Sequence, residues 1–111
     1  MTTALILNSD KMGCGDSQLT EKLITNYFKL IVQEERVINI IALYADAVKL
    51  ACSGSSVLKE LKVMAERGTK IFICTTCLNH YDIASELQVG QKATMMDIID
   101  IQYNADKIIM L

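Results

Sequence analysis

The sequence predicts an α/β fold, a three-layer α/β/α sandwich around a mostly parallel sheet of about five strands. Short apolar runs alternate with longer segments in which apolar residues recur at helical spacing. Aliphatic residues are plentiful and aromatic residues make up only 5% of the chain, a profile typical of buried parallel strands. Right-handed crossovers then place helices on both faces of the sheet. Residues 1–111 are predicted to form one domain without linkers or repeats.

The predicted strands are short apolar segments bounded by turn residues. They span residues 4–8, 37–43, 69–73 and 107–110, and a minimal further strand is predicted at 88–89, where Gly90 turns the chain. Residues 44–52, after the second strand, are compatible with either a loop or a short helical turn.

Four helices are predicted between these strands. The first begins near Ser17 with Asp16 or Ser17 as its N-cap, and its apolar face is predicted to consist of Leu19, Leu23, Tyr27, Leu30 and Ile31. The second follows Ser53-Gly54-Ser55-Ser56, buries Val57, Leu58, Leu61, Met64 and Ala65, and ends at Gly68. A shorter helix is predicted over 78–87, and a last one, capped by Thr94, runs to about Tyr103 with Met95, Ile98, Ile99 and Gln102 at helical spacing.

Composition and charge exclude several classes of protein. The formal net charge is −2 and no block of Lys or Arg occurs, which argues against a nucleic-acid partner. The N-terminus lacks a basic segment followed by a long apolar one, so no signal peptide is expected, and no apolar run has membrane-spanning length. We therefore expect a cytoplasmic protein, where thiols stay reduced and the four cysteines are reactive or metal-binding rather than structural disulfides.

The chemistry-bearing segment is Cys74-Thr75-Thr76-Cys77, which directly follows the third strand. Two cysteines at this spacing lie on one face if the second opens a helix, and amide groups at a helix start favour the nucleophilic thiolate. Sulfur chemistry is the leading interpretation. The alternatives are two small buried hydrophobic side chains and half of a metal site.

All four cysteines are predicted to lie near one edge of the sheet. Cys14 follows the first strand, Cys52 lies in the connection after the second, and Cys74 and Cys77 follow the third. Connections at the carboxyl ends of parallel strands emerge at the edge where ligands bind. The four thiols are thus predicted to share a crevice, as a sulfur-handling site or, second, as a four-cysteine metal site, although only one paired ligand turn exists.

Other readings of the pattern fit less well. A thioredoxin-type oxidoreductase places its cysteines after an early strand beside a cis-proline, and this chain has no proline. A flavodoxin-like cofactor binder would use the first loop for phosphate, but that loop lacks the usual glycine, lysine and hydroxyl pattern. No cofactor is expected.

Several other side chains allow both a functional and a structural interpretation. Lys49 can stabilise a thiolate or be solvated, His80 can shuttle protons or lie on the surface, and Cys14 can carry sulfur or fill space between Gly13 and Gly15. Capping is the favoured role for Asp10 and Asp16, and packing is the favoured role for Tyr81, Met95 and Met96.

The sequence resembles the DsrE/DsrF-like family of small sulfur-relay proteins, most closely the C-terminal domain of YedF-type selenium-metabolism proteins. The likeness covers nearly the whole chain. It rests on segments in matching order: Asn8-Ser9-Asp10 with Gly13-Cys14-Gly15-Asp16, Val48-Lys49-Leu50 with Gly54-Ser55, Cys74-Thr75-Thr76-Cys77-Leu78, and Gly90 with Met95. Cys14 stands where YedF relatives usually carry a basic residue, and Thr94 where they usually carry Asn.

The resemblance implies a persulfide carrier of the sulfurtransferase type, for sulfur or selenium. By position, Cys74 matches the persulfide cysteine and Cys77 the second cysteine of the YedF type, with Cys14, Lys49, Cys52 and His80 as supporting candidates. It also implies homo-oligomers and partner proteins that donate and accept sulfur. The TusA-like domain that commonly precedes this one in relatives is missing, so such a donor would be a separate protein. The alternative is a non-catalytic, oligomeric binding module of the same fold.

Overall fold

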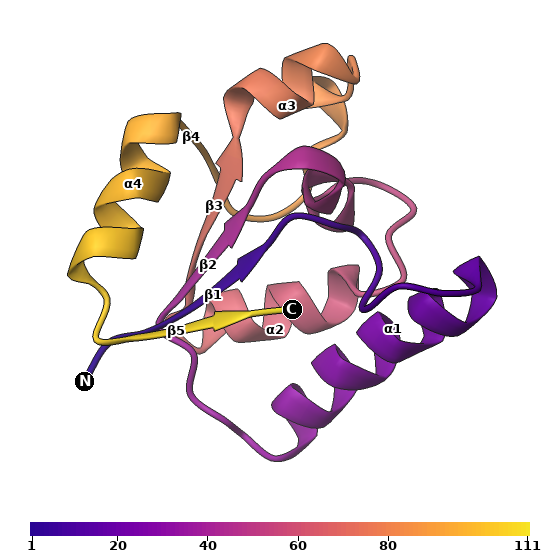
Figure 1. Ribbon diagram of the computed structural model, residues 1–111, viewed down its shortest axis with the longest axis horizontal. Coiled ribbons are helices and arrows are strands. Elements are labelled where there is room, and N and C mark those ends of the chain that lie inside the picture. The colour runs from indigo at the N-terminus through magenta and orange to yellow at the C-terminus, as the bar shows by residue number, and fades with distance from the viewer.

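The computed structural model describes residues 1–111 and contains one five-stranded sheet (Figure 1). Its strands are β1 (Thr3–Leu7), β2 (Ile40–Leu43), β3 (Lys70–Cys74), β4 (Gln91–Ala93) and β5 (Lys107–Met110). All pairings are parallel, and the strand order is β4-β3-β2-β1-β5. The predicted α/β fold with a parallel five-stranded sheet is confirmed. The fourth strand, however, follows Gly90 rather than preceding it.

Helices cover both faces of this sheet. They are α1 (Ser17–Gln33), α2 (Leu58–Glu66), α3 (Thr75–His80) and α4 (Met95–Asn104), with 3-10 helices η1 (Ala45–Ala51) and η2 (Ala84–Glu86). In Figure 1, α1 and α2 lie on one side of the sheet and α4 on the other, while α3 lies beyond the end of β3. The segment that the sequence left open after β2 is thus a 3-10 helix, and the helix predicted over 78–87 is instead the shorter α3 followed by η2.

The core follows the alternation of the strands. Leu5 and Leu7 of β1 belong to a large apolar cluster that includes Phe28 of α1 and Leu61 of α2. The opposite face of β1, with Ala4 and Ile6, packs in a smaller cluster with Ile101 of α4. The buried residues of the three central strands thus point into one of two apolar layers, which fixes the strand register and holds the carboxyl ends of β1, β2 and β3 at a common edge.

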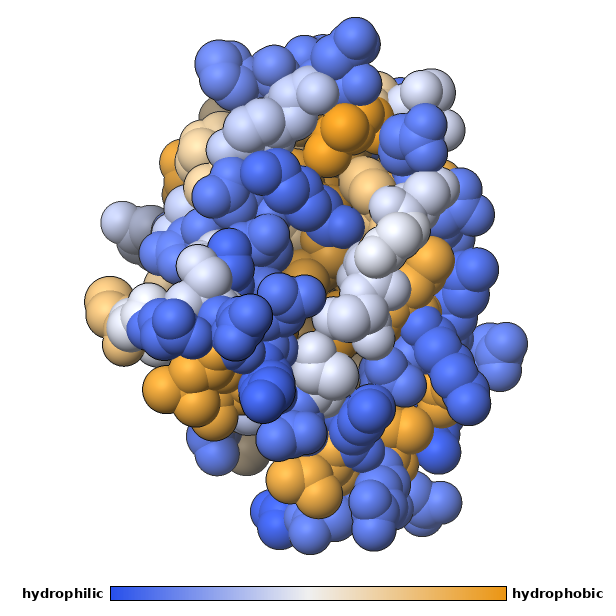
Figure 2. Space-filling view, turned by 90° about the vertical axis from the view of Figure 1, so that its right-hand side faces the viewer, coloured by the Kyte–Doolittle hydropathy of each residue, from blue (hydrophilic) through white to orange (hydrophobic).

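The predicted apolar face of α1 is wrong by about one residue. The helix buries Thr20, Ile24 and Phe28, whereas Leu19, Leu23 and Leu30 are between 41% and 53% exposed. The helix carries apolar residues on two adjacent stripes, and the stripe that holds the aromatic ring of Phe28 faces the sheet. Figure 2 shows the side of the molecule on the right of Figure 1, where hydrophobic groups are separated by hydrophilic ones.

The predicted caps are largely confirmed. The Asp16 carboxylate accepts hydrogen bonds from the N–H groups of Gln18 and Leu19 at the start of α1. Thr94 and Asp97 form a reciprocal capping box at the start of α4. Met95 and Met96, expected in the core, are instead 56% and 66% exposed, because Ile98 and Ile101 take the buried positions of α4. No helix is both long enough and apolar enough to span a membrane.

Candidate functional site

Cys74 and Cys77 lie together at the carboxyl end of β3. Cys74 is the last strand residue and the N-cap of α3, and Cys77 is the third residue of that helix. The two free side chains pair at 3.4 Å. Cys74 is only 2% exposed, whereas Cys77 is partly exposed. The helix opens one residue after Cys74 rather than at Cys77, which brings both thiols into its first turn.

A backbone amide from the neighbouring strand connection points at Cys77. The N–H of Ala45, the first residue of η1, donates a hydrogen bond to the Cys77 Sγ at 3.2 Å. Ala45 has a φ of 53°, in the left-handed region that costs an L-residue about 1–2 kcal/mol. Strained residues of this kind concentrate at functional sites. Because β2 and β3 are adjacent, this contact bridges two neighbouring connections at the edge of the sheet.

The thiol pair lies at the carboxyl end of β3. Open α/β sheets bind ligands at the carboxyl ends of their strands, typically where the strand order reverses. In this sheet the order reverses between β1 and β5, because the chain passes from β4 through α4 to a strand on the other side of β1 (Figure 1). The thiol pair is therefore at the ligand-binding edge of the sheet and away from its switch point.

Opposing effects set the acidity of Cys77. Burial raises the pKa of the Cys77 thiol, the Ala45 N–H lowers it, and the neighbouring Cys74 raises it through its hydrogen bond and its charge when ionised. The net pKa of Cys77 lies above its usual value. The site thus keeps Cys77 mainly as a thiol at neutral pH and supplies one donor that stabilises the thiolate when it forms.

The raised pKa predicts how the reactivity of Cys77 depends on pH. Only the thiolate attacks an alkylating reagent, so below the pKa the rate is expected to rise about tenfold for each pH unit. The rise is expected to continue beyond the pKa of a free cysteine before it levels off. Rates of iodoacetamide labelling of the Cys77 peptide, followed by mass spectrometry against a short unstructured cysteine peptide, test this. A plateau at lower pH than that of the peptide would contradict it.

A group of polar side chains lies beside the thiol pair. The Tyr81 hydroxyl donates a hydrogen bond to the Asp46 carboxylate, and the Lys49 Nζ lies 3.3 Å from the same carboxylate and 4.4 Å from the centre of the Tyr81 ring. These contacts lower the pKa of Asp46 and raise that of Tyr81. Tyr81 is thus a polar partner rather than simple packing. His80 is exposed and stacks edge-on against Tyr81.

The strain at Ala45 gives a prediction about stability. Glycine adopts a positive φ without steric cost, so Ala45→Gly is expected to raise the free energy of unfolding by up to about 1 kcal/mol, after the entropy cost of glycine in the unfolded chain. Urea denaturation measures the difference. Ala47→Gly is the control within the same 3-10 helix, where φ is not positive, and is expected to destabilise the protein. An Ala45→Gly variant less stable than the wild type would contradict the account.

The other two cysteines do not join the pair. Cys14 is exposed in the loop after β1, and Cys52 is buried, with its thiol donating to the carbonyl oxygens of Val48 and Ile83. Burial and the charge of Glu86 raise the pKa of Cys52. No group of three or more His, Cys, Asp or Glu side chains is arranged to hold a metal ion. The predicted shared crevice is therefore wrong, and the four-cysteine metal site loses its geometric basis.

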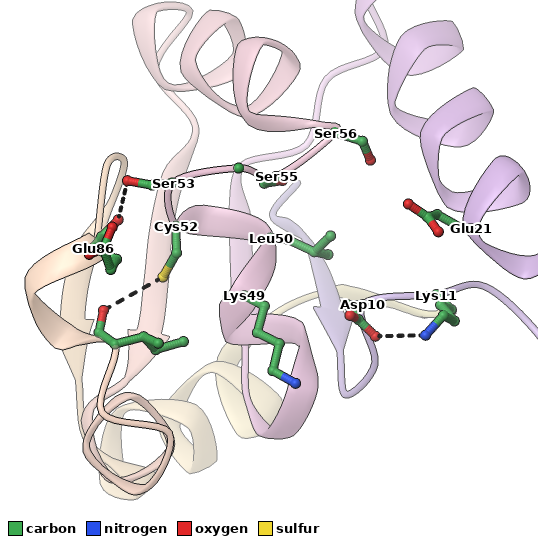
Figure 3. Close-up of a pocket in the computed structure, with 12 residues that line it drawn as sticks. Asp10, Lys11, Glu21, Lys49, Leu50, Cys52, Ser53, Ser55, Ser56 and Glu86 are labelled. Atoms are coloured by element: carbon green, nitrogen blue, oxygen red, sulfur yellow. Dashed lines mark hydrogen bonds and ion pairs between the residues drawn. The ribbon is translucent and has the colours of Figure 1, made fainter. Parts of the chain in front are cut away.

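Cys52 instead lies on the wall of a separate pocket of about 360 Å³ (Figure 3). The other side of this pocket carries Asp10 and Lys11, which form a loose ion pair at 3.9 Å. Lys49 also lines the pocket, while its ammonium group pairs with Asp46. Lys49 thus lies between the pocket and the polar side chains beside the thiols. It forms no hydrogen bond or ion pair with a cysteine sulfur.

Comparisons with known proteins relate the chain to solved structures only. No protein-family model and no curated protein sequence matches it. The crystal structure of YchN from E. coli superposes with a TM-score of 0.72 at 18% identity over the whole of both chains. MTH1491 from Methanobacterium thermoautotrophicum, a protein of unknown function, gives 0.70 at 11% identity, over 99% of this chain and 98% of its own. These structures have a DsrE-like fold.

The chain has a DsrE-like fold. A third such structure, the conserved protein of unknown function BT1422 from Bacteroides thetaiotaomicron, gives a TM-score of 0.64 at 19% identity, over 98% of this chain and 94% of its own. At such identities the similarity concerns the DsrE-like fold alone and assigns no activity, since one fold hosts many functions. It confirms the fold expected from the sequence.

Two residues of the site escaped sequence analysis. Ala45 carries no chemical group that would single it out, because it acts through its backbone N–H, and Asp46 stands in a segment without a recognisable pattern. An alanine followed by an acidic residue shortly after a strand is too common to predict a site. Only the path of the chain between β2 and η1 identifies them.

Proposed function

We propose that this protein carries sulfane sulfur as a persulfide on Cys77, with Cys74 as the second thiol, and relays it between partner proteins. One observation carries the proposal: two free cysteines pair at 3.4 Å, and the partly exposed one, Cys77, accepts a hydrogen bond from a strained backbone N–H. Such a donor stabilises the thiolate that attacks and leaves during sulfur transfer. The proposed likeness to YedF-type proteins is part of this proposal, and so is the alternative that the cargo is selenium instead of sulfur.

The transfer is a balanced exchange at sulfur. The Cys77 thiolate attacks the outer sulfur of a donor persulfide, and the S–S bond of the donor breaks, so that Cys77 gains one sulfur and the donor leaves as a thiolate. An acceptor thiolate then attacks the outer sulfur on Cys77 in the same way and restores the Cys77 thiolate. No net oxidant or reductant is needed. Donor and acceptor are separate proteins, a TusA-like donor among the candidates, in a compartment that keeps thiols reduced.

The proposal reverses the order of the two cysteines that the resemblance implies. Cys74, the expected first acceptor, is 2% exposed, and an incoming persulfide reaches Cys77 first. Cys74 then serves as a second thiol that attacks the inner sulfur of the Cys77 persulfide, which releases hydrosulfide and leaves a Cys74–Cys77 disulfide. That branch ends the relay until a cellular thiol reduces the disulfide. In this proposal Lys49 and His80 do not contact the Cys77 sulfur. Lys49 pairs with Asp46, and His80 packs against Tyr81, beside the thiol pair.

Cyanide discharge tests the proposal. Cyanide removes sulfane sulfur from a persulfide as thiocyanate and returns the thiol, so thiocyanate counts transferable sulfur. The starting protein carries Cys14→Ser, which removes the exposed thiol in the first loop. After loading with a small persulfide, it is expected to yield thiocyanate, as is the further variant Cys74→Ser, while the further variant Cys77→Ser is not. Equal yields from Cys14→Ser and a variant that also lacks Cys74 and Cys77 would overturn the proposal.

A second candidate function is an oligomeric binding module. Met95, Met96 and Ile99 of α4 are between 40% and 66% exposed, and Tyr103 on the same helix is 85% exposed. Neighbouring exposed apolar residues of this kind mark interaction surfaces. Two results together would favour this function: light scattering shows a homo-oligomer that dissociates in the Ile99→Lys variant, and Cys77 accepts no sulfur. A monomeric wild type would remove it.

A further inference from the structure

We infer that Tyr81 is a positioning residue that, through Asp46, holds the Ala45 N–H on the Cys77 sulfur. We call Tyr81, Asp46 and Lys49 the Tyr81 clamp. The functional meaning of the clamp rests on the proposed function, because a held donor matters most where Cys77 reacts as a thiolate. Its test measures the acidity of Cys77 and requires no sulfur transfer.

The contacts of the clamp form a closed ring. At the end of α3, the Tyr81 N–H donates to the carbonyl oxygen of Cys77 at 3.1 Å, which ties Tyr81 to the residue that carries the thiol. The Tyr81 hydroxyl donates to the carboxylate of Asp46. Asp46 directly follows Ala45, whose N–H returns to the Cys77 Sγ at 3.2 Å. The hydrogen bonds of Tyr81 to Cys77 and to Asp46 thus restrain the amide of η1 close to the sulfur of α3.

Lys49 completes the clamp from one turn along η1. Its Nζ lies 3.3 Å from Asp46 Oδ1 and 4.4 Å from the centre of the Tyr81 ring. The ammonium group therefore offsets a carboxylate that would otherwise repel a thiolate close by. Since Asp46 and Lys49 are each about half exposed, solvent screens this ion pair, and the hydroxyl–carboxylate hydrogen bond is the stronger link.

The strained backbone at Ala45 explains why a clamp is needed. A residue at a φ of 53° relaxes to ordinary geometry unless neighbouring contacts hold it, and relaxation would turn its N–H away from the sulfur. The titratable groups around this place are Cys74 on the same turn, Asp46 and Lys49 on η1, and Tyr81, with Asp10 and Lys11 acting at longer range from the first loop. Only Ala45 donates a hydrogen bond to the Cys77 sulfur.

Tyr81→Phe tests the clamp by removing one hydroxyl group. Without it, the Ala45 N–H loses its restraint and the thiolate its donor, so the pH profile of Cys77 alkylation is expected to shift upward by about one pH unit. At a fixed pH below the pKa this makes labelling about tenfold slower. Iodoacetamide labelling of the Cys77 peptide, followed by mass spectrometry, gives the profile. Tyr103→Phe is the matched control, the same change at a tyrosine exposed on α4, and is expected to leave the profile unchanged.

Asp46→Asn separates geometry from charge. The amide oxygen of asparagine still accepts from the Tyr81 hydroxyl, so the profile is expected to stay within about twofold of the wild-type rates, as for an exposed and screened charge. A Tyr81→Phe profile identical to that of the wild type would overturn the clamp, even if the unfolding temperature falls, because Tyr81 would then stabilise the fold without positioning the donor. Equal shifts in Tyr81→Phe and Tyr103→Phe would overturn it too.

The clamp and the sulfur carrier fail separately in these experiments. A shifted alkylation profile in Tyr81→Phe, in a protein that yields no thiocyanate, would support the clamp and remove the carrier function. A normal thiocyanate yield with an unshifted alkylation profile in Tyr81→Phe would support the carrier function and remove the clamp.

Discussion

Replacing Gly90 by alanine is expected to lower the free energy of unfolding by about 3 kcal/mol or more. Gly90 has a φ of 83°, and a Cβ built there would lie 2.5 Å from Ile73 Cδ1 and 2.7 Å from the carbonyl oxygen of Ile71. The side chain of Ile73 can turn away, but the Ile71 carbonyl belongs to the backbone of β3. The methyl group would thus push β4 away from the strand whose end carries the thiols.

Gly13→Ala is the matched control for this substitution. Gly13 has the same φ of 83°, and nothing lies within 4 Å of the position of its Cβ. Its cost is therefore backbone strain alone, about 1 kcal/mol. Urea denaturation of both variants isolates the steric contribution, because the backbone contribution is common to both. Equal destabilisation of the two variants would contradict the close approach of Gly90 to β3.

The fold was largely predictable because local pattern and tertiary structure agree over most of the chain. Apolar runs predicted β1, β2, β3 and β5 at or near their observed bounds, since buried parallel strands need uninterrupted aliphatic residues. The face of α1 was not predictable in the same way. Leu23 and Ile24 are adjacent and equally apolar, and only packing of the neighbouring Phe28 under the sheet decides which of the two is buried. Helical periodicity alone leaves such neighbouring stripes equivalent.

The candidate site was predictable in part. The position of Cys74 and Cys77 after the third strand follows from the strand pattern, and the structure brings these two together. The convergence of all four cysteines failed because connections at one edge of a sheet can still point in different directions. Cys14 is carried outward by its loop, and Cys52 lies at the far end of η1, where its thiol binds carbonyl oxygens. Loop conformation is not encoded by spacing.

Removing the sulfur of Cys77 is expected to have the largest effect on function. In the Cys14→Ser protein, Cys77→Ser is expected to lower sulfur loading from a small persulfide about tenfold or more, because a serine hydroxyl is not ionised at neutral pH and is not a comparable nucleophile. Cys74→Ser keeps the exposed thiol and its Ala45 donor, so its loading is expected to persist and to be more stable, since the attack that expels hydrosulfide is lost. The total mass of each intact protein before and after loading measures this.

The most direct measurement is the location of the added sulfur. The Cys14→Ser protein is loaded under native conditions with less than one equivalent of a small persulfide, its remaining thiols are blocked with a fast alkylating reagent, and peptide mass spectrometry assigns the extra sulfur atom. This atom is expected on Cys77 at first, with Cys74 carrying it only as a minor product. Sulfur found mainly on Cys52 or Cys74, or absent from the protein altogether, would contradict the claim that Cys77 is the thiol through which this protein handles sulfur.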